Sequence, residues 1–322
     1  MTLGVKVHKF GGPEVLQWES LSVGHPGSGQ IRLRHTAVGL NFIDVYHRTG
    51  LYPQPLPFVP GVEGAGVVEE VGADVLNLKV GDHVAYALGI GAYSEERLIA
   101  ADRVVKIPDG ISDDTAAAMM LKGMTVQYLI RRIHKVKQGD AILIHAAAGG
   151  IGLILCQWAS HLGATVIGTV SSKDKADLAR ANGCAYPVVS TGTDFVAAVK
   201  DISSGKGLPV VYDSIGRDTF HKSLECLKPL GTMVLFGQAS GAVEPIDPNI
   251  LQRGSWFLTR PTLGTYIASR SDLEQTADEL FEVVKSGVVN IEINQKYPLR
   301  DAQLAHRDLE ARKTTGSTIF NV

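Results

Sequence analysis

The sequence predicts an α/β protein of two domains, an irregular and mainly antiparallel β-barrel followed by a doubly wound parallel sheet. The chain has 322 residues, which is about twice the length of a typical domain. Short stretches with strand character, separated by glycine and proline, occupy its first hundred residues. From residue 140 onward, short apolar stretches alternate with amphipathic ones, a pattern typical of a parallel sheet with helices on both faces.

Three stretches in the first part have the pattern of strands. Residues 30–38 alternate polar and apolar side chains, as a half-buried strand does. Residues 64–72 and 81–86 are further predicted strands, each bounded by glycine. Residues 52–60 contain four prolines in nine positions, which excludes a helix and predicts an extended loop.

The second part begins with two predicted helices, one starting at residues 116–120 behind a Ser112 cap and one over 125–134. Strands are expected at 141–145, 164–170, 185–189, 210–213 and 232–236, with helices at 152–162, 173–181, 194–202 and 218–227. After residue 260 we expect a helix over 272–286, a strand over 288–293 and a last helix over 301–312. This tail is too short for a domain of its own and is expected to return to the first one.

Composition excludes several classes of protein. Thirty-one Lys and Arg against 33 Asp and Glu give a net charge of -2, so charge gives no reason to expect a nucleic acid or an anionic membrane as partner. The three cysteines form no CxxC pair, which favours a reducing compartment. The N-terminus lacks the apolar core of a signal peptide, and the most apolar stretch, 142–156, is shorter than a bilayer span. We expect a cytoplasmic protein.

The glycine content is high, 35 residues, and one glycine cluster carries the clearest chemical signal. Residues 145–152 read His-Ala-Ala-Ala-Gly-Gly-Ile-Gly, between an apolar predicted strand and an apolar predicted helix. A glycine turn in this context lets backbone amides approach a pyrophosphate at the positive end of the helix. A tight turn without a ligand is the alternative. AxxGGxG is a variant of the GxGxxG dinucleotide fingerprint.

The residues after the second strand favour NADPH over NADH. NAD sites place an acidic residue at the tip of that strand, but here Val170 is followed by Ser-Ser-Lys-Asp-Lys. Hydroxyl and ammonium groups suit a 2′-phosphate. Asp174 is the nearest acid, and we expect it to cap the next helix. Alternatively, Lys173 and Lys175 are only the solvated start of that helix.

The chain resembles the medium-chain dehydrogenase/reductase superfamily, and within it the zinc-free NADPH:quinone oxidoreductases related to zeta-crystallin. The similarity runs over essentially the whole chain. It rests on residues 11–16, 39–44, 46–52, 64–66, 81–82, 147–152, 211–216 and 236–241.

This resemblance implies a GroES-like barrel domain over 1–121 that is completed by 261–322, a Rossmann NADPH-binding domain over 122–260, and a cleft between them. It also implies a set of cofactor-binding residues: Asn41, Thr125, Gly149, Gly150, Ile151, Gly152, Ser172, Lys175, Phe236, Gly237, Ser240 and Arg312. The family's tyrosine after the third strand aligns with Ser190, which leaves that contact open. Arg312 is expected in the last helix, where it could equally be an ordinary cation at a helix C-terminus.

The resemblance also predicts that no metal is bound. Zinc-dependent members use a cysteine where this chain has Asn41, and a Gly-His-Glu triplet where it has Gly61-Val62-Glu63. No cysteine precedes Cys156, and the ten histidines are scattered, so the spaced ligands of a zinc site are missing. We expect His145 to be a hydrogen-bonded core histidine rather than a ligand.

Without a Lewis acid, the expected reaction is reduction of an acceptor that delocalises negative charge, such as a quinone or an enone. Asn41, Tyr46 and Tyr52 are the candidate catalytic residues, because they fall in the segment expected to line the cleft. Barrel packing is the alternative for both tyrosines.

Three functions remain open. The leading one is an NADPH-dependent quinone reductase, the second an NADPH-dependent enone or alkenal reductase, and the third an NADPH-binding structural or RNA-associated protein. We also expect a homodimer paired through residues 255–260, unless that stretch is a buried inner strand.

Overall fold

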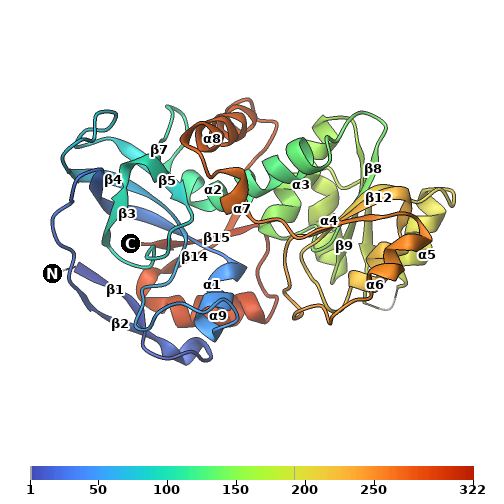
Figure 1. Ribbon diagram of the computed structural model, residues 1–322, viewed down its shortest axis with the longest axis horizontal. Coiled ribbons are helices and arrows are strands. Elements are labelled where there is room, and N and C mark those ends of the chain that lie inside the picture. Colours follow the sequence, from blue (N-terminus) through green and yellow to red (C-terminus); the bar gives the residue numbers. More distant parts are fainter. Residues whose placement is uncertain (1, 192) are drawn as a thin grey trace. The chain divides into compact units, whose positions relative to one another are not determined.

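The computed structural model describes residues 2–191 and 193–322 (Figure 1). The chain divides into two compact units. The first combines the segment ending at Met124 with Ile267–Lys285 and Ile291–Val322. The second comprises Thr125–Tyr266 and Ser286–Asn290.

The first unit is built on a mainly antiparallel sheet of seven strands in the order β14-β15-β3-β4-β5-β7, with β6 also paired to β3. Only the β14–β15 pair is parallel. A separate hairpin joins β1 to β2. The strands are β1 (Thr2–Val7), β2 (Leu16–Leu21), β3 (Gln30–Leu40), β4 (Glu63–Val71), β5 (His83–Ala87), β6 (Glu96–Ala100), β7 (Val105–Lys106), β14 (Ile293–Pro298) and β15 (Ser317–Asn321).

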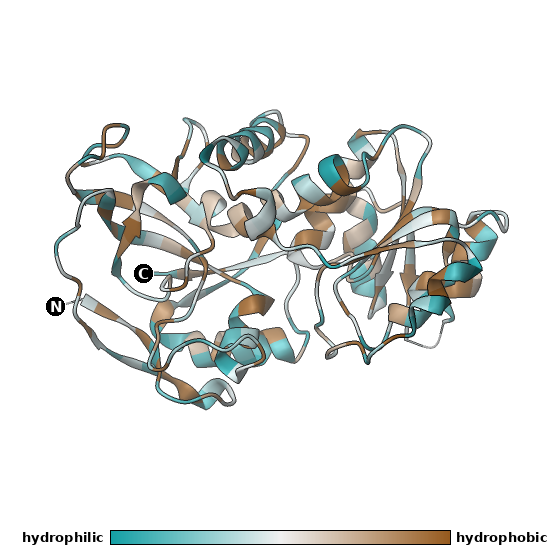
Figure 2. Ribbon diagram, viewed as in Figure 1, coloured by the Kyte–Doolittle hydropathy of each residue, from teal (hydrophilic) through white to brown (hydrophobic). Residues whose placement is uncertain are grey.

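Alternation along β3 supplies much of the core of this unit. Ile31 and Leu33 point inward and are fully buried, together with Val84, Tyr93 and Phe320 from neighbouring segments. The helices of the unit are α1 (Phe42–Thr49), α8 (Arg270–Lys285) and α9 (Ala302–Glu310), and α2 (Asp113–Tyr128) begins in it. Figure 2 shows that α8 is mostly hydrophilic, in keeping with a helix that buries only one stripe.

The second unit is a parallel sheet in the order β10-β9-β8-β11-β12-β13. Its strands are β8 (Ala141–Ile144), β9 (Thr165–Val170), β10 (Tyr186–Val189), β11 (Leu208–Asp213), β12 (Leu227–Leu235) and β13 (Phe257–Thr259). The chain moves outward from β8 through β9 to β10, and then returns to β11 on the other side of β8. Doubly wound topology, as predicted, follows from this reversal.

Helices cover both faces of this sheet. Phe195 of α5 (Phe195–Ile202) and Phe220 of α6 (Phe220–Leu224) share one apolar cluster with Leu143 and Val211 of the sheet. The other face receives α3 (Gly150–His161) and α4 (Lys173–Ala181). Because β8 and β11 are covered on both faces, their residues form continuous apolar runs.

Several local predictions need correction, and one helix was not predicted. Helix α2 is one continuous helix whose last turn widens into a π-helical segment, Leu129–Ile133, instead of two helices. Helix α6 is shorter than expected, and α1 was not predicted. The strand expected over 288–293 is wrong, because β14 begins at Ile293. The apolar Val289, which suggested a strand, is instead buried in a loop. The backbone of the neighbouring Asn290 is hydrogen-bonded to the side-chain amide of Gln157.

Candidate functional site

The glycine turn in the second unit connects β8 to α3. Ala146 adopts a left-handed conformation, with φ of 56°, and turns the chain sharply after the strand. Gly149 then caps α3, and its carbonyl accepts the Leu153 N–H at 2.9 Å. The first N–H groups of an α-helix have no intrahelical acceptor. The positive end of α3 is therefore suited to an anion.

Gly152 is required by close packing under this turn. A Cβ atom there would lie 2.4 Å from the Ala146 carbonyl oxygen and 2.6 Å from the Ala147 carbonyl carbon. Gly149 is more tolerant, since its Cβ would approach only the Ala146 oxygen, at 3.2 Å. Gly168 on β9 makes room from the other side, because its Cβ would meet that of Ala147 at 2.5 Å.

Ser172 and Lys175 lie together at the start of α4, directly after β9. Ser172 is the N-cap, and its Oγ accepts the Lys175 backbone N–H at 3.3 Å. Asp174 was expected to cap this helix, but it occupies the first turn instead. Ser190, at the end of the next strand, donates its hydroxyl to the Val170 carbonyl at 3.1 Å.

The loop after β12 contains Phe236, Gly237 and Ser240. A Cβ on Gly237 would lie 2.6 Å from the Ser214 carbonyl oxygen, so glycine allows this loop to pack against the loop after β11. The Ser240 hydroxyl donates to the Ile215 carbonyl at 2.8 Å and accepts the Asp218 N–H at 3.1 Å. Ser240 therefore fastens two loops together.

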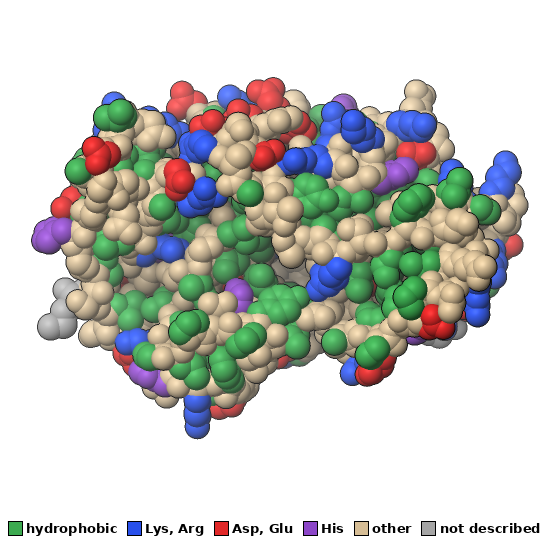
Figure 3. All heavy atoms as spheres, in the orientation of Figure 1, with side chains coloured by type: hydrophobic (Ala, Val, Ile, Leu, Met, Phe, Trp, Pro, Cys, Tyr) green, Lys and Arg blue, Asp and Glu red, His purple; other side chains and the backbone are tan. Residues whose placement is uncertain are grey.

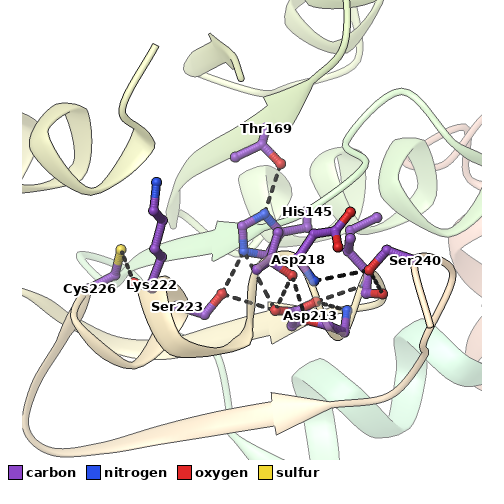
Figure 4. Close-up of polar contacts among 11 residues, drawn as sticks. His145, Thr169, Asp213, Asp218, Lys222, Ser223, Cys226 and Ser240 are labelled. Carbon is purple, nitrogen blue, oxygen red and sulfur yellow. Dashed lines mark hydrogen bonds and ion pairs between the residues drawn. The ribbon is translucent and has the colours of Figure 1, made fainter. Parts of the chain in front are cut away.

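A buried polar chain holds the edge of the sheet beneath these loops (Figure 4). His145 lies between Thr169, 2.8 Å from Nδ1, and Ser223, 2.8 Å from Nε2. Ser223 donates in turn to Asp213 at 2.9 Å. Burial lowers the pKa of His145, so the ring is neutral. The prediction of a hydrogen-bonded core histidine is confirmed.

Asp213 is the acceptor at the end of this chain. Its carboxylate also accepts the N–H groups of Ile215 and Gly216 and the Thr219 hydroxyl, at 2.7–3.0 Å. Asp213 is fully buried, and these donors satisfy it. It therefore fixes the turn after β11, a role that was not predicted from the sequence.

The carboxyl ends of β8, β9 and β12 thus bring the glycine turn, the Ser172–Lys175 pair and the Phe236–Ser240 loop to the same edge of one sheet. The reversal between β8 and β11 creates the switch point where open α/β sheets bind their ligands. Thr125 lies in α2 of this unit and is buried, hydrogen-bonded to the Tyr128 side chain.

In the first unit, the three candidate catalytic residues lie on or just after α1. Asn41 is the N-cap, and its N–H donates to Asp44 at 2.9 Å. Tyr46 and Tyr52 form an edge-to-face pair with ring centroids 5.2 Å apart. Tyr46 is only 8% exposed, which favours packing for most of its ring, and Tyr52 is half-buried.

Asn41 belongs to a buried cluster that was not predicted from the sequence. Its Nδ2 donates to Glu63 Oε2 at 2.7 Å, and the Lys122 ammonium contacts the same oxygen at 2.9 Å. The other carboxylate oxygen accepts the Leu121 N–H at 2.7 Å. Glu63 is fully buried, and Asn41 and Lys122 are each 6% exposed. The one sequence feature that pointed to this cluster is Lys122 itself, a single lysine among the apolar residues of α2.

Asp44 lies next to this cluster and ends a second polar chain. The Tyr93 hydroxyl donates to Asp44 Oδ2 at 2.9 Å and contacts His306 at 3.0 Å. On its other side, His306 contacts the Arg48 guanidinium, which in turn pairs with Glu310 through two hydrogen bonds. Burial raises the pKa of Asp44 to about 7 and lowers that of His306 to about 3.

Arg312 is not in the last helix as predicted. Helix α9 ends at Glu310, and Arg312 follows in a left-handed conformation, with φ of 58°, and is exposed. The two sets of candidate residues are thus divided: Asn41, Tyr46, Tyr52 and Arg312 belong to the first unit, and the others to the second.

Known proteins resemble the chain over its whole length. Residues 27–109 match the alcohol dehydrogenase GroES-like domain and residues 150–282 match the zinc-binding dehydrogenase family. A quinone oxidoreductase of Pseudomonas aeruginosa is 49% identical and a 2-haloacrylate reductase of Burkholderia 48% identical, each alignment covering 99% of both chains. The crystal structure of Escherichia coli quinone oxidoreductase complexed with NADPH superposes with a TM-score of 0.98 at 46% identity, over 99% of this chain and all of that one.

A GroES-like unit together with a Rossmann unit defines the medium-chain dehydrogenase/reductase class of oxidoreductases. Within that class, the chain belongs to the quinone oxidoreductase family. No helix in the part of the chain that the structure describes is both long enough and apolar enough to cross a membrane.

Proposed function

We propose that the protein is an NADPH-dependent quinone oxidoreductase, which transfers reducing equivalents from NADPH to quinones without a metal. The observation that carries the proposal is the edge of the parallel sheet, where a glycine turn and a helix N-terminus stand beside a hydroxyl–ammonium pair and no acid occupies the tip of β9. The family relationship supports quinones as acceptors.

The residues of the second unit fit the dinucleotide. Gly149, Gly150, Ile151 and Gly152 would hold the pyrophosphate through backbone N–H groups, and Gly152 permits the close packing beneath the turn that places these groups. Ser172 accepts a backbone N–H, which leaves its hydroxyl proton to donate to the 2′-phosphate alongside Lys175. Phe236, Gly237 and Thr125 would border the cofactor. Ser240 would act mainly by fastening the loop, and Arg312 remains a candidate for the phosphates.

Zinc does not fit the residues around Asn41. A zinc ligand must offer a lone pair, but the Asn41 amide directs its nitrogen toward Glu63, and both Glu63 oxygens already accept N–H groups. Val62 has no donor atom. Among the described residues, no three His, Cys, Asp or Glu side chains gather as metal ligands. We therefore propose a metal-free site.

Bound NADPH supplies the reducing equivalents, and this chain's residues orient and surround the acceptor. Asn41 and Tyr52 are proposed to contact the quinone or the nicotinamide ribose. Tyr46 supports the Tyr52 ring edge-to-face and would contribute mainly an apolar wall.

Reduction of a conjugated double bond is the second candidate, because a 2-haloacrylate reductase is 48% identical to the chain. Both reactions place negative charge on a delocalised acceptor. A structural or RNA-associated role has less support, since on the face that Figure 3 shows acidic and basic side chains are interspersed and the net charge is -2.

We further propose that the protein is a cytoplasmic homodimer. Strand β13 is an edge strand of its sheet, so the alternative of a buried inner strand is wrong. Phe257 on this strand is 60% exposed. An apolar edge of this kind is suited to pairing with a second copy.

A steady-state screen of NADPH and NADH against 1,4-benzoquinone, an aliphatic enone and 2-chloroacrylate, with and without a chelator, tests the function. We expect NADPH oxidation with the quinone to be fastest and insensitive to the chelator. Turnover only with the alkenes would favour the second candidate, and NADPH binding without turnover would favour the third. Asn41→Ala and Tyr52→Phe are expected to slow quinone reduction; unchanged rates in both would reject these site residues.

A further inference from the structure

The Lys122 ammonium is buried with only part of its hydrogen-bonding capacity used. It carries three N–H donors, but its only hydrogen-bond and ion-pair partner within residues 2–191 and 193–322 is Glu63 Oε2, at 2.9 Å. Lys122 is 6% exposed. Burying an ammonium is costly unless its donors find acceptors. The remaining donors therefore need an acceptor that the described part of the chain does not provide.

The fold is shaped to keep this cation in place. A Cβ on Gly39 would lie 2.2 Å from Glu63 Oε2, so a glycine is required to admit the carboxylate. The Leu121 N–H and the Asn41 amide then hold Glu63 from two further directions. Glu63 thus positions Lys122 and Asn41 together, and Asp44 adjoins the cluster with an Oδ1 atom that has no partner in the described residues.

We infer that Lys122 is a catalytic residue whose free N–H donors bind the acceptor oxygen that becomes negative on reduction. This inference rests on the proposed function, through the placement of Asn41 in the site. In hydride transfer, the quinone gains two electrons and one proton while NADPH becomes NADP⁺. The resulting hydroquinone monoanion then takes a proton from water. A fixed ammonium stabilises that anion more than the neutral quinone, which is the condition for accelerating the reaction.

Lys122 would thus supply a positive charge without a metal. Lys122 and the neighbouring Asn41 would then bind different groups. Because Asn41 directs its nitrogen to Glu63, a ligand can bind this amide only through its carbonyl oxygen, which also faces the Asp44 N–H in the capping box of α1, and an oxygen accepts hydrogen bonds. Asn41 therefore suits a hydroxyl, such as one on the cofactor ribose, whereas Lys122 suits the anionic oxygen of the acceptor.

A binding experiment with 4-nitrophenol tests this role without turnover. The probe is quinone-sized, and its phenolate is distinguished from the phenol by absorbance. With saturating NADP⁺, we expect the wild-type protein to bind the phenolate at least tenfold more tightly than 4-nitroanisole, which carries no charge. Lys122→Met should abolish that preference, whereas Lys122→Arg should retain most of it. Equal phenolate binding by wild type and Lys122→Met would overturn the inference.

Lys122→Met leaves Glu63 as an unpaired buried charge, which destabilises the fold. The double variant Lys122→Met/Glu63→Gln removes both charges and serves as the second test. Lys9→Met, on an exposed lysine, is the matched control. We expect NADPH binding to be within about threefold of wild type in all folded variants, and kcat with 1,4-benzoquinone to fall by about 10²-fold in both that lack Lys122.

The outcomes separate this inference from the proposed function. A wild-type protein that does not reduce 1,4-benzoquinone would contradict the proposed function itself. A wild-type protein that does so, together with a folded double variant of equal kcat and equal phenolate preference, would contradict only the role of Lys122.

Discussion

Replacing Gly152 by alanine tests how the glycine turn holds a dinucleotide. The added Cβ would lie 2.4–2.6 Å from backbone atoms of Ala146 and Ala147, where ordinary contacts begin near 3.4 Å. Backbone atoms cannot rotate away, so the start of α3 must move. Overpacking of this kind costs about 1–3 kcal/mol. If that cost falls on the geometry that binds the pyrophosphate, NADPH affinity decreases by about 5- to 140-fold.

Gly149→Ala is the matched control for this experiment. Its Cβ would make a single close contact, 3.2 Å from the Ala146 oxygen, and Gly149 has a φ of -82° that any residue adopts. We expect NADPH titration, followed by fluorescence quenching, to show a large loss for Gly152→Ala and a change under threefold for Gly149→Ala. Equal affinities for the two variants would refute the packing argument, as would a Gly152→Ala protein that binds like wild type.

Three further predictions concern other parts of the molecule. Lys175→Met should weaken NADPH binding by about 10- to 100-fold while leaving NADH binding unchanged, with Lys173→Met as the control; an equal loss for both cofactors would exclude the phosphate role. Burial lowers the pKa of His35 to about 3, so between about pH 6.5 and pH 3 the unfolded chain binds a proton that the folded protein does not. Stability therefore decreases as the pH is lowered through that window, by about 1.4 kcal/mol per pH unit. His35→Gln should remove this contribution to the pH dependence of the free energy of unfolding, measured by urea unfolding. An unchanged pH dependence would show that His35 is protonated in the folded protein. Phe257→Lys, at the exposed edge of β13, should shift the protein from dimer to monomer in sedimentation velocity, and a wild-type monomer at micromolar concentration would reject the dimer.

The parts of the fold that depend on local pattern could be predicted from the sequence. Helix α4 matches its predicted bounds, because Ser172 caps an amphipathic run. The strand expected at 288–293 failed because burial of Val289 in a loop imitates the apolar signal of a strand. Strand β14 is instead defined by pairing with β15, which is information from a distant segment.

The same distinction applies to the candidate site. The glycine turn is a local motif and was recognised, whereas the Glu63–Lys122 contact joins residues 59 positions apart. The spacing of polar and apolar residues along the sequence does not indicate a contact between such distant positions. Arg312 was expected in the last helix, but that helix ends at Glu310 in a left-handed turn at Arg312, which no glycine marks in the sequence.

The pairing of Lys122 with Glu63 also bears on how this site and a metal site could be interconverted. Exchanging Asn41 and Val62 for metal ligands would leave the Lys122 ammonium, 2.9 Å from the shared carboxylate, as a fixed cation beside the incoming ion. Like charges at such short range repel strongly where water is excluded. A metal beside the intact pair would therefore be disfavoured, whereas losing the lysine before a metal replaced it would leave Glu63 buried without a counter-charge.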